Sequence, residues 1–120
     1  MYLIGYIVNY CFTEAFIIVS ELNQIQADIF KAIAHPTRIE ILNLLKDGER
    51  CVCEIFPALD IEQPNVSRHL SVLKKEGILS SRKEGLKVIY RVNDDRVYII
   101  LDLAREMLKA HYNSRKEFLL

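Results

Sequence analysis

The sequence predicts a mostly helical domain with one small β-hairpin, and three observations predict it. Apolar residues recur at helical spacing on both sides of two short β-branched runs, at residues 78–84 and 86–92. Pro and Gly residues separate these segments, and no internal repeat or low-complexity linker interrupts them. The 120 residues are enough for one domain, and a 51% apolar composition can supply its core.

The first two helices meet at His35-Pro36. The first is predicted over residues 21–34 and ends there, because a residue before proline is driven out of the helical conformation. Pro36 then suits the first turn of the second helix, where its missing N–H costs nothing, and Gly48 ends that helix. The apolar faces are Leu22, Ile25, Ile29 and Ile33 in the first helix, and Ile39, Leu42 and Leu45 in the second.

Two further helices are joined by a tight turn through Asp60. The third is short and is predicted over residues 51–56, stopping before Pro57. The fourth starts at Gln63-Pro64 and stops at Gly77. Its apolar face is Val66, Leu70 and Leu73. Two helices in this arrangement are typical of a helix-turn-helix.

A tight hairpin around Glu84-Gly85 follows, and Asn93 is expected to cap a last helix that runs to about Tyr112. The apolar face of that helix is Val97, Ile100, Leu101, Ala104 and Leu108. A face this broad predicts a dimer surface, with packing on the chain's own first helix as the alternative. The fold class is therefore a winged helix-turn-helix, mostly α with a small β-hairpin wing, and a homodimer through its first and last helices.

The formal net charge of zero hides an uneven distribution. Residues 1–60 carry eight acidic and four basic side chains, whereas residues 61–92 carry three acidic and seven basic ones. A basic segment within a neutral protein predicts contact with nucleic acid, because affinity for phosphate depends on local charge. A solvated helix face is the alternative that charge alone leaves open.

The N-terminal segment is unusually apolar, with fifteen apolar residues among the first nineteen. It has no basic start, which a secretory signal needs, and Asn9 and Glu14 would be costly within a membrane. An extra packing element and translated upstream sequence outside the native product remain as alternatives. We therefore divide the chain into an N-terminal extension of uncertain status (1–20), a DNA-binding domain (21–113) and a C-terminal tail (114–120).

Four stretches in order resemble the ArsR/SmtB family of metal-sensing transcriptional repressors. They are Ala34-His35-Pro36-Thr37-Arg38, Glu49-Arg50-Cys51-Val52-Cys53-Glu54-Ile55, Gln63-Pro64-Asn65-Val66-Ser67-Arg68-His69-Leu70 and Leu73-Lys74-Lys75-Glu76-Gly77-Ile78. The similarity covers about residues 27–108. It implies a homodimer that binds double-stranded operator DNA without any cofactor and releases it when a metal or metalloid ion binds.

The start of the fourth helix is the predicted reading segment, because a recognition helix presents its N-terminal residues to base edges in the major groove. Gln and Asn side chains can read adenine, and Arg reads guanine or binds phosphate. The hairpin arms are expected to lie along the DNA backbone or minor groove. The candidates are Gln63, Asn65, Ser67, Arg68 and His69 in the helix, and Arg82, Lys83, Lys87 and Arg91 in the wing.

Cys51 and Cys53 are the predicted metal ligands. In a regular helix, residues two apart point about 200° away from each other, so chelation of one ion is expected to unwind the start of the third helix. Thiolates favour soft ions, namely arsenite, antimonite, cadmium, lead or zinc. Members of the resembling arsenic-sensing type have a third cysteine where this chain has Phe56. In the cadmium- and lead-sensing type, cysteines of an N-terminal extension complete the site, and the resemblance makes Cys11 the candidate for that part. Two small buried apolar side chains are the structural alternative for the pair.

The function predicted from these features is a metal- or metalloid-responsive transcriptional repressor. The three cysteines, two of them in Cys-Val-Cys, suit a reducing compartment and predict a cytoplasmic protein with no membrane partner. One alternative is a redox-responsive repressor with a disulfide from Cys11 to Cys51 or Cys53. Another is a winged-helix interaction module that senses nothing. An enzyme is not expected, because no paired carboxylates, Cys-His couple or glycine-rich phosphate loop occurs.

Overall fold

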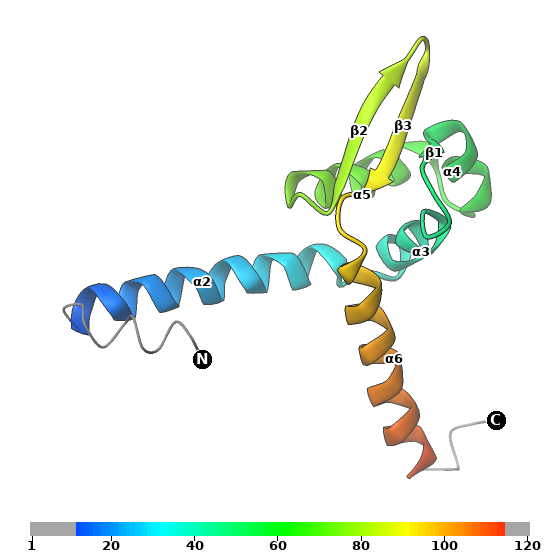
Figure 1. The fold of residues 1–120 in the computed structure, drawn as a ribbon. Helices are drawn as coiled ribbons and strands as arrows, with labels where there is room; N and C mark the ends of the chain where they lie inside the picture. Colours follow the sequence, from blue (N-terminus) through cyan, green and yellow to red (C-terminus); the bar gives the residue numbers. More distant parts are fainter. Residues whose placement is uncertain (1–11, 115–120) are drawn as a thin grey trace.

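The computed structural model describes residues 12–114 of the chain, with side chains from residue 16 onward (Figure 1). Over these residues it is helical with a small antiparallel sheet, which confirms the predicted fold class. The elements follow in the order α2 (Phe12–Ile33), α3 (Pro36–Leu44), β1 (Arg50–Cys51), α4 (Val52–Ala58), α5 (Gln63–Lys75), β2 (Leu79–Glu84), β3 (Lys87–Val92) and α6 (Arg96–Asn113).

The junction of α2 and α3 forms as the sequence predicts. His35 is extended, Pro36 follows in the first turn of α3, and the His35 ring accepts a hydrogen bond from the backbone N–H of Thr37 at 3.1 Å. This side chain caps α3, satisfying a donor that the helix itself leaves free. Helix α2 begins at Phe12, nine residues before the predicted start, so part of the apolar N-terminal segment continues the first helix.

The hydrophobic core lies between α3, α4, α5 and the start of β2, and the first turn of α6 completes it. Its fully buried side chains are Ile41, Leu42, Ile55, Val66, Leu70, Leu73 and Leu79. The hydroxyl of Tyr98 in α6 donates a 2.7 Å hydrogen bond to the carbonyl of Leu42 in α3. Helices α4 and α5 of the helix-turn-helix are therefore packed against one core.

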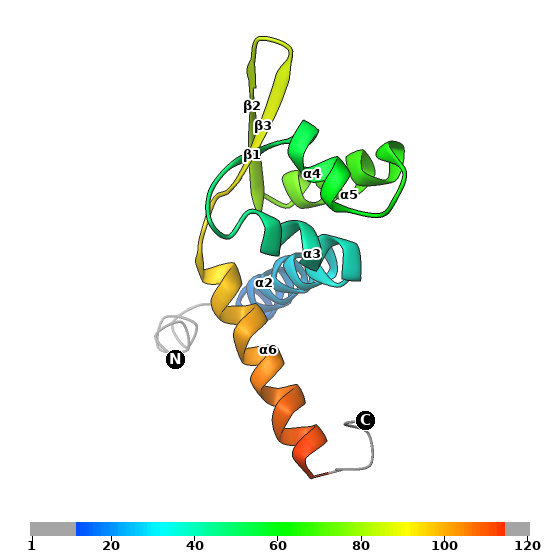
Figure 2. The same cartoon turned by 90° about the vertical axis from the view of Figure 1, so that its right-hand side faces the viewer.

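The sheet has the strand order β1-β3-β2, and all its pairs are antiparallel. Gly85 has a positive φ of 63° in the two-residue turn between β2 and β3, a conformation that glycine adopts without strain. Figure 2 shows this hairpin projecting away from the helices. Strand β1 was not predicted, and it pairs Cys51 with Ile89 of β3. The cysteine motif is thus attached directly to the wing.

Besides the start of α2, three predictions about helix ends are wrong. Helix α3 ends at Leu44 rather than at Gly48. The third helix does not stop before Pro57, because α4 continues to Ala58, with Cys51 as its extended N-cap residue. Asn93 does not cap the last helix, because its side-chain amide donates instead to the carbonyl of Gly77 at 2.8 Å. Asp95 occupies the N-cap position of α6, and β3 ends at Val92.

Helices α2 and α6 leave the core in different directions, as Figures 1 and 2 show. The radius of gyration is 18.6 Å, against about 13 Å for a compact domain of this size. The apolar face of α6 therefore does not pack along α2 of the same chain, which was the alternative to a dimer surface. Within residues 12–114, no helix is long and apolar enough to cross a membrane.

Candidate nucleic-acid interface and thiol site

The N-terminal half of α5 presents polar side chains to solvent. Gln63, Asn65, Ser67 and Arg68 are all exposed, whereas Val66 between them is fully buried. Pro64 in the first turn sets the start of the helix, and Glu62 at its N-cap position is extended. Four of the five predicted reading residues thus lie on the solvent side of an anchored helix, where a DNA groove could reach them.

His69, the fifth, has a different environment. Its ring is half-buried and packs against the His35 ring, with centroids 4.3 Å apart. Burial lowers the pKa of His69 below its ordinary value of 6.5, and the charges of His35, Arg38 and Arg68 lower it further. Its Nδ1 atom is buried and accepts no hydrogen bond from the described residues. His69 therefore joins α5 to the α2–α3 junction.

The hairpin carries the four predicted basic residues on exposed positions. Within residues 16–114, Lys83 and Lys87 form no ion pair, so both charges face solvent near the tip of the wing. Arg91 donates a hydrogen bond from Nε to the hydroxyl of Ser80 at 3.0 Å and likewise has no carboxylate partner among these residues. These cations suit contact with phosphate groups.

Arg82 differs from the other wing cations because two carboxylates hold it. Its guanidinium donates two 2.6 Å hydrogen bonds to Glu49 and further ones of 2.8 and 3.0 Å to Glu84. The paired guanidinium lowers the pKa of Glu49, and both carboxylates raise the pKa of Arg82. Part of the charge of Arg82 is thus neutralised within the chain.

The two cysteines of the motif are joined by a disulfide bond. Cys51 is buried at the end of β1 and caps α4, where its Sγ accepts a hydrogen bond from the N–H of Cys53 at 3.0 Å. The expectation that the two side chains point apart is wrong, because Cys51 is extended and lies outside the regular helix. The disulfide predicted for a redox-responsive repressor, from Cys11 to Cys51 or Cys53, is also wrong, because Cys51 and Cys53 are bonded to each other. Both Sγ atoms already lie together without any unwinding of α4.

A pocket of about 420 Å³ borders the cysteine pair. Gln63 and Ser67 of α5 line it, and so do Lys87, Val88 and Tyr90 of β3. The remaining lining residues are Cys51, Val52, Cys53, Phe56 and Leu86. A group bound at the two sulfurs would therefore lie between α5 and the wing.

The reduced pair offers two soft ligands, and their proximity fits a single thiophilic atom. Among the side chains that the structure describes, no group of three His, Cys, Asp or Glu residues could hold a metal ion. Phe56 takes the place that the resembling arsenic-sensing type gives to a third cysteine. Cys11, the other candidate ligand, lies outside the described residues.

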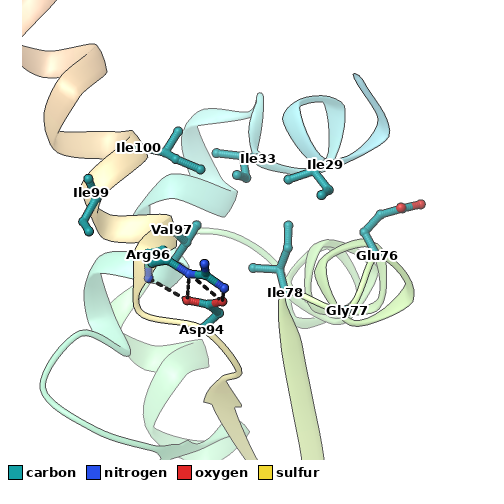
Figure 3. Close-up of a pocket in the computed structure, with 10 residues that line it drawn as sticks. All are labelled: Ile29, Ile33, Glu76, Gly77, Ile78, Asp94, Arg96, Val97, Ile99 and Ile100. Carbon is teal, nitrogen blue, oxygen red and sulfur yellow. Dashed lines mark hydrogen bonds and ion pairs between the residues drawn. The ribbon is translucent and has the colours of Figure 1, made fainter. Parts of the chain in front are cut away.

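Large apolar side chains are exposed along both long helices. Phe16, Ile25, Leu103 and Met107 are 69, 58, 60 and 74% exposed. A pocket of about 530 Å³ lies where α2 and α6 diverge, with Ile29, Ile33, Ile78 and Ile100 around it (Figure 3). Asp94 and Arg96 form a 2.6 Å ion pair at its edge, and the guanidinium lowers the pKa of Asp94 to about 2. Exposed apolar side chains gathered along two helices in this way are typical of an interaction surface.

Comparison with known proteins identifies the family. Residues 35–81 match the family described as "Bacterial regulatory protein, arsR family". An uncharacterized HTH-type transcriptional regulator of Methanocaldococcus jannaschii is 49% identical over 82 residues, which are 68% of this chain and 92% of that protein. The arsenical resistance operon repressor of Escherichia coli is 47% identical over 66 residues, which are 54% of this chain and 56% of that protein.

Solved structures agree. The crystal structure of Rv0081 of Mycobacterium tuberculosis has a TM-score of 0.70 at 34% identity and covers 78% of this chain and 95% of that one. A homodimeric winged helix-turn-helix DNA-binding domain of Mycobacterium bovis has a TM-score of 0.69 at 30% identity and covers 79% and 88%. These relatives are named as regulators, which confirms that the protein is not an enzyme. The chain belongs to the ArsR family of winged helix-turn-helix transcriptional regulators.

Proposed function

We propose that the protein is a homodimeric repressor that binds operator DNA and releases it when a soft metal or metalloid ion binds the reduced Cys51–Cys53 pair. One observation carries this proposal. The cysteine pair is attached to the wing by the β1–β3 pairing and borders a pocket that Gln63 and Ser67 of the recognition helix also line. A structural change at the sulfurs would thus be transmitted both to the wing and to α5, the two elements proposed to bind DNA.

DNA recognition would divide between helix and wing. Gln63, Asn65 and Ser67 would contact base edges, and Arg68 would read guanine or bind phosphate. Lys83, Lys87 and Arg91 would neutralise phosphates, which supplies affinity without sequence preference. Arg82 remains a candidate, weakened by its two carboxylate partners. His69 also remains one, although its packing on His35 favours a role in holding the helix.

The second copy of the chain would cover the apolar faces of α2 and α6. The Mycobacterium bovis domain described above is homodimeric, and the exposed apolar side chains here lie on the two helices that leave the core. Dimerisation would also place two recognition helices on one side of the DNA, about 34 Å apart for successive major grooves. Operator DNA lies in the cytoplasm, so the repressor would act there.

The ions that fit the pair are those that prefer thiolates: arsenite, antimonite, cadmium, lead and zinc. The E. coli relative is named for arsenical resistance, which supports the metalloids. Cys51 and Cys53 would hold the ion, with Cys11 as a candidate further ligand. A cellular dithiol must first reduce the disulfide, giving two thiols and the oxidised form of that reductant. DNA binding itself would need no cofactor.

Release would follow from the position of Cys51. Its backbone pairs with Ile89 of the wing strand, and its side chain caps α4, which a short turn joins to α5. When the sulfur bonds an ion, it no longer accepts the N–H of Cys53, and the end of β1 and the start of α4 must adjust. A coupling of about 1–3 kcal/mol between the two sites would weaken DNA binding about 5- to 150-fold.

The test is a fluorescence-anisotropy titration of reduced, full-length protein on DNA from upstream of its own gene, repeated with each ion. We expect tight binding that salt weakens and that one of these ions reverses. Tight binding that no ion reverses would contradict the sensing claim. If the affinity for this DNA is no higher than the affinity for a scrambled duplex, the claim that the repressor regulates its own gene is contradicted.

The disulfide favours a second candidate function, a repressor controlled by oxidation of the same pair. Oxidation of two thiols by diamide would form the bond and yield the reduced hydrazine. If redox state alone controls DNA binding, diamide will change operator affinity in the absence of any ion. Equal affinity of the oxidised and reduced proteins would eliminate this candidate.

A further inference from the structure

Leu86 occupies the tip of the hairpin, where nothing in the fold requires an apolar side chain. Glu84 pairs with Lys87, so the turn between the strands consists of Gly85 and Leu86. Gly85 has a positive φ of 63° and Leu86 does not, which is the arrangement of a type II′ turn. The second position of such a turn usually holds Asn, Asp or Ser. Leu86 is fully exposed and does not belong to the hydrophobic core.

The length of the hairpin carries this leucine far from the core. Each strand has six residues, and exposure rises along β2 from the buried Leu79 to the exposed Glu84. Six residues extend about 20 Å at a rise of about 3.4 Å per residue. On B-DNA with about 34 Å per turn, a minor groove lies half a turn, about 17 Å, from the neighbouring major groove. The tip would therefore reach the adjacent minor groove when α5 lies in the major groove.

The pocket between α5 and the wing leaves room for the DNA strand that separates these two grooves. Gln63 and Ser67 of α5 line this space of about 420 Å³, and Leu86, Lys87 and Val88 of the wing line it as well. Among the lining residues that the structure describes, Lys87 is the only charged one, so the charge of the lining is positive. A sugar–phosphate strand can thus pass between the helix and the wing without meeting a carboxylate of the lining.

The two lysines of the tip place positive charge on both faces of the hairpin. Lys83 lies opposite Val88 and Lys87 lies opposite Glu84, and these are consecutive pairs. Successive pairs of a β-hairpin point to opposite faces, so the two lysines do too. The charge of Glu84 is balanced by its ion pair with Arg82. A minor groove has a phosphate strand along each edge and stacked base pairs between them, which matches an apolar tip between two cations.

We propose that Leu86 is a minor-groove wedge that enters between two stacked base pairs and bends the operator DNA. The inference rests on the proposed function and adds a specificity-determining residue outside the recognition helix. Apolar side chains that enter a minor groove partly unstack one base step and kink the duplex towards the major groove. The lysines hold the phosphates on either side while the leucine occupies the opened step.

The wedge gives a sequence preference without a hydrogen bond to any base. The pyrimidine–purine steps TA and CA/TG unstack most easily, so binding favours an operator that has such a step where the wing lies. The two wings of a homodimer contact symmetric positions, so one opened step is expected in each half-site. Each of these steps contains a thymine, and an unstacked thymine can be detected chemically.

The experiment uses the reduced full-length protein and DNA from upstream of its own gene. Permanganate oxidises unstacked thymines, and the gel mobility of circularly permuted fragments measures the bend. With saturating wild-type protein, we expect reactive thymines at two symmetric steps and a bend of about 20–90° at each. Neither signal should appear in the free fragment.

Three variants separate a wedge from a phosphate contact. Leu86→Ala keeps the exposed turn but should lose the reactive thymines and the bend, and specific affinity should fall about tenfold with an unchanged salt dependence. Leu86→Phe retains a large apolar group and should retain both signals. Lys83→Ala is the matched control on the same tip. It should weaken binding and lower the salt dependence by about one ion, while the saturated DNA stays unstacked.

A change of the DNA tests the same contact from the other side. Replacing each reactive step by GG, which is stiffer, should weaken binding of the wild-type protein about tenfold. The same replacement should affect Leu86→Ala much less, because its binding no longer opens the step. Equal losses for the two proteins would contradict the wedge.

The failures are distinguishable. If the upstream DNA binds no more tightly than a scrambled duplex, the proposed function fails and the inference fails with it. If the wild-type protein binds specifically but leaves every thymine stacked, the inference is overturned and the proposed repressor stands. The same holds if Leu86→Ala produces the same reactive thymines as the wild type, even at reduced affinity, because Leu86 would then contact something other than an opened base step.

Discussion

The guanidinium of Arg82 donates two hydrogen bonds of 2.6 Å to the carboxylate of Glu49, which lies two residues before Cys51. This pair joins the outer strand of the wing to the segment that enters β1. The negative charge of Glu49 also reduces the positive potential of the wing. Glu84 reduces it further, because it pairs with the same guanidinium. Local charge on the hairpin therefore depends on intramolecular partners as well as on the number of basic residues.

Replacing Glu49 by Gln should strengthen DNA binding. The change removes one negative charge and frees Arg82 for phosphate, so affinity should rise about three- to tenfold at low salt and the salt dependence should steepen by about one ion. Anisotropy at several salt concentrations measures both quantities. Glu106→Gln on α6 makes the same charge change away from the wing. Equal effects of the two variants would rule out a local role for the pair.

Tyr98→Phe should destabilise the protein by about 1 kcal/mol, because it removes the buried hydrogen bond to the Leu42 carbonyl. Urea denaturation at fixed protein concentration measures the loss. Tyr112→Phe removes an exposed hydroxyl of the same helix and should change the free energy of unfolding little. A Tyr98→Phe variant as stable as the wild type would show that the bond contributes nothing to stability.

Tyr98 also predicts a loss of stability at high pH. Burial raises its pKa from 10.0 to about 12, so the unfolded chain releases this proton first. Stability from this group is present below pH 10 and falls as the pH rises from 10 to 12. The fall should be smaller in Tyr98→Phe than in the wild type. Identical alkaline profiles would contradict the assignment.

His69 predicts a loss of stability on the acid side. Its pKa lies below 6.5 in the folded chain because of burial and of the charges around it, which come from His35, Arg38 and Arg68. The unfolded chain therefore takes up this proton first, and stability from the group is complete above pH 6.5 and declines as the pH falls below it. His69→Asn should flatten this decline, whereas His111→Asn, at an exposed position, should not.

The proposed dimer predicts that Leu103→Glu produces a monomer. A charge placed on the exposed apolar face of α6 would be buried in the dimer at high cost, yet it stays in water in the monomer. Sedimentation should give about half the wild-type mass, with helicity retained. Lys109→Glu, outside the apolar set on the same helix, is the control. A dimer of undiminished affinity in Leu103→Glu would place the interface elsewhere.

Local signals predicted most of the fold. Pro36 and Pro64 lie in the first turns of α3 and α5, and Gly77 and Gly85 have the positive φ angles of a helix end and a hairpin turn. These residues act through their own backbone restrictions, which a single sequence reveals. Apolar spacing then assigned the buried face of each helix, as Val66, Leu70 and Leu73 illustrate.

The thiol site was less predictable because it depends on contacts between distant residues. Strand β1 has only two residues and no periodicity of its own, and it forms because Cys51 pairs with Ile89. That pairing makes Cys51 extended and brings its sulfur to Cys53, contrary to the helical geometry expected. The Arg82–Glu49 pair spans 33 residues and likewise leaves no local signal. Glu54 is an exception, because its position three residues after Cys51 is the spacing of a capping box, which is a local sequence signal.

The central claim is tested most directly by measuring DNA release in Cys51→Ser and Cys53→Ser with the effector that releases the reduced wild-type protein. Serine retains a polar atom of similar size but bonds soft ions weakly. Operator affinity without effector should stay within about threefold of wild type, since the coupling requires a bound ion, and release should be lost in both variants. Normal release in both would contradict the account.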